Sequence, residues 1–189
     1  MKGARPLTDE EINLILSRGF EGKYALRNQV LFLLRVKTGL RVSEALSIKV
    51  VDVFYDGQVR DRVYISRKNT KGKVEGRSIL LHPVLKEQLR LFITTLPPTV
   101  EYLFTSNKGK HLDKRSVWRI DKDACRRLGI DPKRVSTHST RKTFAEKVHS
   151  ILDKDLVKTQ RALGHKDINS TVKYLHVNDK DIDDAISKI

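Results

Sequence analysis

The chain has 189 residues and a formal net charge of +15, because 38 lysines and arginines outnumber 23 aspartates and glutamates. This length fits one domain with a hydrophobic core, and the basic excess favours a polyanion as partner over a merely basic surface. The single cysteine excludes an internal disulfide, and no apolar run approaches the ~20 residues of a membrane span, so we expect a soluble, cytoplasmic protein.

The first part of the chain predicts two helices and a corner. Thr8 and Glu11 have the spacing of a capping box, in which each side chain accepts from the backbone amide of the other, and they open a helix. A second helix is expected over residues 24–37, where apolar residues recur at helical spacing, and Gly39 ends it. Arg41 then stands at a corner before a further helix, where flanking helices can hold a side chain in a site.

The sequence period then changes to that of strands. Residues 50–55 are predicted to form a strand, residues 56–57 a hairpin turn, and residues 62–65 an alternating second strand. A third strand is expected at residues 77–81, after a lysine-rich loop. The fold class is therefore α+β, mainly α-helical with a small three-stranded antiparallel sheet.

Helices dominate the remainder. Pro83 is expected to open one helix, and residues 112–128 to form another with Trp118 in the core. A later helix over residues 154–163 is closed by Gly164.

Four short motifs carry side chains suited to phosphate chemistry. Arg41 lies in Thr38–Glu44, and His138–Arg141 places a histidine and an arginine at i and i+3, on one face of a helix. Leu163–His165 ends in a second histidine, and Tyr174 follows nine residues later. A guanidinium donates to two phosphate oxygens, a histidine exchanges protons near neutral pH, and a tyrosine hydroxyl can form a covalent intermediate. This set is what a phosphate-handling site with a covalent nucleophile requires.

In the order TGLRVSEAL, HSTR, LGH and a downstream tyrosine, these motifs resemble those of the tyrosine recombinases, the phage integrases and related site-specific recombinases. The resemblance extends from about Leu7 to Tyr174. It implies a single catalytic domain over residues 1–189, and we expect the usual N-terminal core-binding domain to be absent. It also implies site-specific recombination by DNA cleavage and rejoining through a covalent 3′-phosphotyrosyl intermediate, with no ATP, metal or other cofactor.

The resemblance also implies roles for the candidate residues. Arg41 and Arg141 would neutralise the two non-bridging phosphate oxygens, and His165 would add a hydrogen bond. Tyr174 would attack the phosphorus. Glu44 would support Arg41, the alternative being that the two form a solvated surface pair.

Proton transfer is assigned to His138 as base and to a lysine of the 67–75 loop as acid. Lys71 fits the acid best and Lys73 second. Most lysines of this loop are expected only to contact phosphates. The residues expected to bind DNA are Arg67, Lys68, Lys73 and Lys142.

Two other functions stay open at this point: a tyrosine-type DNA topoisomerase, and a catalytically inactive DNA-binding regulator. In all three cases the expected partner is double-stranded DNA. We also expect self-association on DNA, no membrane partner, and a cytoplasmic, nucleoid-associated location.

Overall fold

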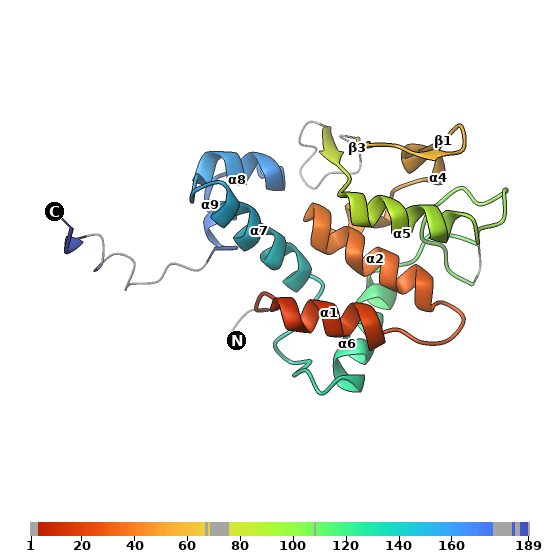
Figure 1. Cartoon of the computed structure of the whole chain (residues 1–189), viewed down its shortest axis with the longest axis horizontal. Helices are drawn as coiled ribbons and strands as arrows, with labels where there is room; N and C mark the ends of the chain where they lie inside the picture. Colours follow the sequence, from red (N-terminus) through yellow and green to blue (C-terminus); the bar gives the residue numbers. More distant parts are fainter. Residues whose placement is uncertain are drawn as a thin grey trace. The chain divides into compact units, whose positions relative to one another are not determined.

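The computed structural model describes residues 4–66, 68, 76–107, 109–175, 183 and 186–188. The chain divides into two compact units, of which unit 1 spans Met1–Phe144 and unit 2 spans Ala145–Ile189. Unit 1 combines helices with short strands, whereas the described part of unit 2 is helical (Figure 1).

Unit 1 begins with two helices: the first starts, and the second ends, where the sequence predicts. In front of α1 (Asp9–Arg18), Thr8 Oγ1 accepts from the Glu11 amide, and the Glu11 carboxylate accepts from the Thr8 amide. Helix α2 (Ala25–Thr38) ends at Gly39, which has a left-handed φ of 62°. Capping box and glycine stop are thus both confirmed.

The predicted strand over residues 50–55 is mostly wrong, because its first part is a helical turn. Residues Val50–Val53 form the short helix α4. The Asp52 carboxylate accepts from the Lys49 amide at 2.8 Å, which caps the turn. This local cap outweighs the strand preference of the valines, a preference that depends strongly on context.

The strands form two separate ladders in place of the single three-stranded sheet that we expected. Strand β1 (Phe54–Tyr55) pairs with β2 (Gln58–Val59) across the predicted turn at residues 56–57. Strand β3 (Arg62–Ile65) pairs antiparallel with β4 (Arg77–Leu80). Alternate residues of β3 are exposed and buried, as its sequence predicts.

Helix α5 (Pro83–Ile93) begins at its proline, and α6 (Lys114–Arg127) begins after an Asp113 cap. The expectation that Trp118 lies in the core is wrong, because 43% of its surface is exposed. The Lys122 ammonium lies over its ring, 5.4 Å from the centroid. The buried residues of α6 are instead Val117, which precedes Trp118, and Asp121, Lys122, Ala124 and Cys125.

Helix α2 is the centre of unit 1 and contributes to two hydrophobic clusters. Leu34 belongs to a cluster with residues of α3 (Val42–Leu46), α5 and β3. Phe32 and Val36 belong to a second cluster with residues of α1 and α6. Because apolar neighbours cover it on both sides, α2 is buried along most of its length, which fixes the position of the corner that follows.

Unit 2 contains most of α7 (Ser139–Ile151), then α8 (Leu156–Leu163) and α9 (Asn169–Val172). Helix α8 ends at Gly164 in a left-handed conformation, as predicted. Over the described ranges, no helix is both long and apolar enough to cross a membrane.

Candidate active site

Arg41 lies at the corner between α2 and α3, and the corner requires a glycine. A side chain at Gly39 would be strained by its positive φ and would collide with the ring of Phe144. Arg41 is then held at both ends by Glu44. Its amide donates to Glu44 Oε2 at 2.9 Å, and its guanidinium Nη1 donates to Oε1 at 2.7 Å.

The burial of Glu44 decides between the two interpretations of this pair. The Glu44 side chain is 0% exposed, whereas the Arg41 side chain is 20% exposed. A solvated surface ion pair therefore does not describe it. Burial and two hydrogen bonds to one partner make Glu44 a support that fixes the direction of the Arg41 guanidinium.

Arg141, in the first turn of α7, reaches the same corner. Its Nη1 donates to the carbonyl oxygen of Gly39 and lies 4.0 Å from Glu44 Oε2. The structure thus brings the two predicted arginines to one carboxylate, although they are far apart in the sequence. The two arginines differ in exposure to solvent, because the Arg141 side chain is only 1% exposed and the Arg41 side chain is 20% exposed.

A third arginine, which the sequence analysis missed, joins this carboxylate. Arg77 is the first residue of β4, and its Nη2 donates to Glu44 Oε2 at 3.3 Å. The pKa of Arg77 is lowered. Burial is the largest cause and the charge of Arg41 adds to it, while the charge of Glu44 acts in the opposite direction. The available signal was the strand alternation, which puts Arg77 on the same inward face as Ile79.

The other predicted residues of unit 1 are less enclosed. His138 is exposed and precedes α7, so that it differs in burial from Arg141, with which it was expected to share a helix face. Its amide donates to Ser136 Oγ at 3.1 Å. Lys142 is half-buried. The predicted Arg67, Lys71 and Lys73 lie outside the described residues.

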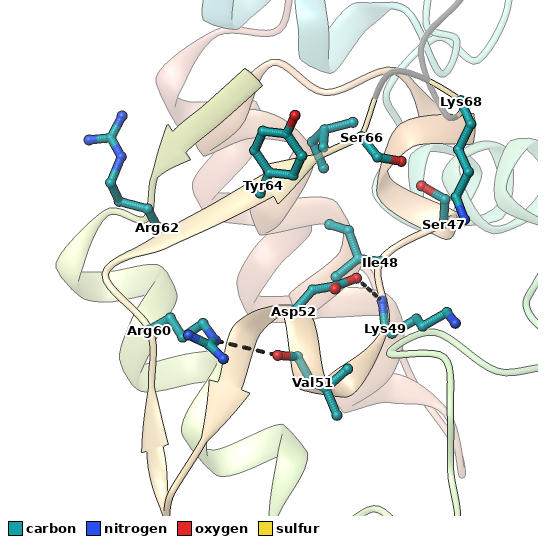
Figure 2. A pocket seen from close by; sticks show the side chains of 11 residues that line it. Ser47, Ile48, Lys49, Val51, Asp52, Arg60, Arg62, Tyr64, Ser66 and Lys68 are labelled. Atoms are coloured by element: carbon teal, nitrogen blue, oxygen red, sulfur yellow. Dashed lines mark hydrogen bonds between the residues drawn. The ribbon is translucent and has the colours of Figure 1, made fainter. Parts of the chain in front are cut away.

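Lys68 is described and lines two neighbouring hollows of about 520 and 500 Å³, which share Ser47, Lys49 and Lys68. In Figure 2 the Lys68 side chain extends towards Ser47, the residue that ends α3. Arg60 and Arg62 line the first hollow as well. Basic side chains therefore extend from the end of α3 along β3.

In unit 2, the predicted histidine and tyrosine lie side by side. The ring centroids of His165 and Tyr174 are 5.3 Å apart. His165 is buried, and its Nδ1 forms a 2.9 Å hydrogen bond with Oγ1 of Thr171, a fully buried residue that the sequence analysis missed. Thr171 therefore fixes the orientation of the His165 ring.

The described side chains offer no metal centre, since no three histidine, cysteine, aspartate or glutamate residues among them are grouped closely enough to hold an ion. What they offer is three guanidiniums around one buried carboxylate, and a histidine–tyrosine pair. The first can hold an anion such as a phosphodiester, and the second contains a tyrosine hydroxyl, a group that can act as a nucleophile.

Comparison with known proteins identifies the class. Residues 5–181 match the phage integrase family model, so the chain belongs to the phage integrase family and has the catalytic-domain fold of a tyrosine recombinase. The mainly helical α+β fold class is thereby confirmed.

Individual relatives are recombinases. The chain is 31% identical over 156 residues to the tyrosine recombinase XerH of Campylobacter jejuni, covering 82% of this chain and 43% of XerH. It is 27% identical over 189 residues to the tyrosine recombinase XerA of Pyrococcus furiosus, covering 97% and 61% of the two chains. A crystal structure of XerH bound to its palindromic difH substrate in a post-cleavage complex matches with a TM-score of 0.77 and 25% identity, over 96% of this chain and 52% of that one. The chain thus spans roughly half the length of these relatives.

Proposed function

We propose that this protein cleaves and rejoins DNA strands in site-specific recombination, through a covalent 3′-phosphotyrosyl intermediate. One observation carries the proposal: the buried Glu44 carboxylate gathers the guanidiniums of Arg41, Arg77 and Arg141. Such a concentration of forked cationic donors suits a phosphodiester, on which negative charge builds during in-line attack.

In the proposed reaction, Tyr174 Oη attacks the phosphorus, and the bond from phosphorus to the 5′ oxygen breaks. The products are a tyrosine–3′-phosphate link and a free 5′ hydroxyl, and the reverse reaction rejoins the strand. Arg41 and Arg141 stabilise the developing charge on the non-bridging oxygens. Arg41 is accessible, whereas Arg141 is buried and must become accessible as DNA binds. His165 donates a further hydrogen bond.

Two proton transfers accompany these steps. The attacking tyrosine loses a proton, for which His138 is the proposed base, and its exposed position leaves it open to the substrate. The leaving 5′ oxygen gains a proton, for which Lys71 is the proposed acid and Lys73 the second choice. Because the covalent link conserves the energy of the phosphodiester bond, rejoining needs no nucleotide cofactor.

The proposed partner is double-stranded DNA, on which copies of the protein associate, at the nucleoid in the cytoplasm. The relatives support DNA as partner, since the XerH and Tn1549 integrase structures are described as complexes with DNA. The charge of +15 supports it independently.

The test is covalent trapping on duplexes with a randomised segment and a nick just beyond it. After cleavage, the short 5′-hydroxyl fragment diffuses away and the protein–DNA adduct persists on a denaturing gel. We expect the wild-type adduct to form at one sequence, and Tyr174→Phe to abolish the adduct while folding and DNA binding are retained. An undiminished adduct from this variant would refute the assignment of the nucleophile. Trapping at many sequences would indicate a topoisomerase, and trapping at none would indicate a binding protein.

A further inference from the structure

We propose that Arg77 is a positioning residue of this site, which acts through Glu44 and keeps Arg41 and Arg141 in the arrangement that cleavage needs. This inference rests on the proposed function. It differs from it in assigning a task to a residue that lies on the strand ladder, outside the four sequence motifs.

Both oxygens of the Glu44 carboxylate accept hydrogen bonds from arginines. Oε1 accepts from Arg41 Nη1 at 2.7 Å, and Oε2 accepts from the Arg41 amide at 2.9 Å and from Arg77 Nη2 at 3.3 Å. Arg141 Nη1 stands at 4.0 Å from Oε2, beyond hydrogen-bond distance. Two arginines therefore bind the carboxylate directly, and the third lies just outside.

Removing the Arg77 guanidinium would take one hydrogen-bond donor away from Glu44 Oε2. A fully buried carboxylate that loses a donor is destabilised unless another donor replaces it. The nearest other guanidinium is that of Arg141, which needs to move only from 4.0 Å to hydrogen-bond distance. A direct pair with Glu44 would then turn Arg141 towards the carboxylate and compete with its contact to a phosphate.

Arg77 also connects its own strand to the site. Arg77 lies opposite Ile65 in the β3–β4 ladder, so its bond to Glu44 connects this end of the ladder to α3. Arg77 thereby fixes the first residue of β4 relative to the arginine corner.

The alternative is an ion pair that only stabilises the fold. Three measurements distinguish a positioning role from a purely stabilising one. They are the rate of cleavage in a single turnover at saturating protein, on the sequence trapped above, the affinity for DNA, and the thermal unfolding midpoint. The variants are Arg77→Gln and Arg77→Lys. The control is Arg90→Gln, because Arg90 is paired with Glu87 at 2.8 Å on the surface of α5 and does not contact Glu44.

We expect Arg77→Gln to slow cleavage by about 10- to 100-fold, because a displacement of about 1 Å in a group that holds the substrate can cost about 100-fold in rate. DNA affinity should change by less than about threefold, since most of the affinity comes from other phosphate contacts. Arg77→Lys keeps the positive charge and one donor nitrogen, so it should cleave faster than Arg77→Gln and slower than the wild type. Arg90→Gln should cleave at the wild-type rate.

A double-mutant cycle with Glu44→Gln then tests the route of the effect. If Arg77 acts through Glu44, Arg77→Gln should slow cleavage by less than about twofold in a protein that already carries Glu44→Gln, since the effects of coupled residues do not add. Equal costs in both backgrounds would overturn the proposal. Wild-type-like cleavage by Arg77→Gln would overturn it too, with the proposed function intact. Failure of the wild-type protein to cleave at all would instead refute the proposed function.

Discussion

Buried polar side chains set the directions of the candidate catalytic groups at the scale of single residues. Glu44 binds the guanidinium of Arg41, and Thr171 binds Nδ1 of His165. Neither Glu44 nor Thr171 is exposed at all. A buried hydrogen bond of this kind restricts the rotamers of its partner, which is how a site is held in a reactive geometry before substrate arrives.

Replacing Thr171 by valine tests this positioning. The change removes the hydrogen bond to His165 while keeping the shape of the side chain, so we expect cleavage to slow by about tenfold or more. Thr171→Ser should retain most of the rate. The measurement is single-turnover cleavage of the trapped sequence.

Unit 2 offers a matched control in Thr159, which is also fully buried and bonds Nδ1 of His149 at 2.9 Å. Thr171→Val removes the hydrogen bond to His165 and should cost about 1 kcal/mol of stability. Thr159→Val removes the hydrogen bond to His149 and also the one that Thr159 Oγ1 donates to the Asp155 carbonyl oxygen at 2.7 Å, and should cost about 2 kcal/mol. Only the change at Thr171 should affect cleavage. Equal cleavage by the two variants would show that Thr171 serves stability alone.

A buried ion pair joins secondary-structure elements in unit 1. Arg35 of α2 and Asp121 of α6 form two parallel bonds, of 2.8 and 2.6 Å, with side chains that are 1% and 4% exposed. Apolar residues surround this part of α6, and burial raises the pKa of the neighbouring Cys125 thiol to about 11. In such surroundings a charge is tolerated only with its partner.

Asp121→Asn should therefore lower the free energy of unfolding by about 3–5 kcal/mol, because it leaves the Arg35 charge buried without its counter-charge. The control is Asp123→Asn on the same helix, which breaks an exposed pair with Arg126 and should cost less than about 1 kcal/mol. Urea titration of both variants measures the difference. A loss at Asp121 as small as that at Asp123 would mean that packing alone joins the two helices.

Charge is the dominant property of the whole molecule. Lysines and arginines exceed acidic residues by 15, and basic side chains line the hollow beside β3 (Figure 2). Binding through phosphate contacts releases counterions, so it weakens with salt but does not by itself read sequence.

DNA binding by this chain should therefore be steeply salt-dependent, with a loss of about 10³–10⁵ in affinity between about 50 and 200 mM salt if about 6–10 phosphates are contacted. Lys68→Ala should weaken binding to all sequences and reduce the slope against log salt by about one. Lys86→Ala, which removes a lysine paired with Asp61, is the matched control. A salt titration on trapped and scrambled duplexes checks this, and salt-tolerant binding would contradict it.

The sequence by itself determined the features that depend on near neighbours. The capping box of Thr8 and Glu11, the glycine stops at Gly39 and Gly164, and the turn at residues 56–57 all form where predicted. Each is decided by a few consecutive residues, through caps and backbone conformations that no distant contact needs to supply. The family, too, followed from short motifs in a fixed order.

The tertiary structure decided what depends on distant contacts. The sequence alone did not place Trp118 on the surface, nor did it divide the strands into two ladders. It named Arg41, Glu44 and Arg141 but missed Arg77: strand alternation places Arg77 on the inward face of β4, but nothing local shows that a carboxylate of α3 lies there. Only folding brings three arginines from separate segments to one buried carboxylate, because Arg41, Arg77 and Arg141 reach Glu44 from the α2–α3 corner, β4 and α7.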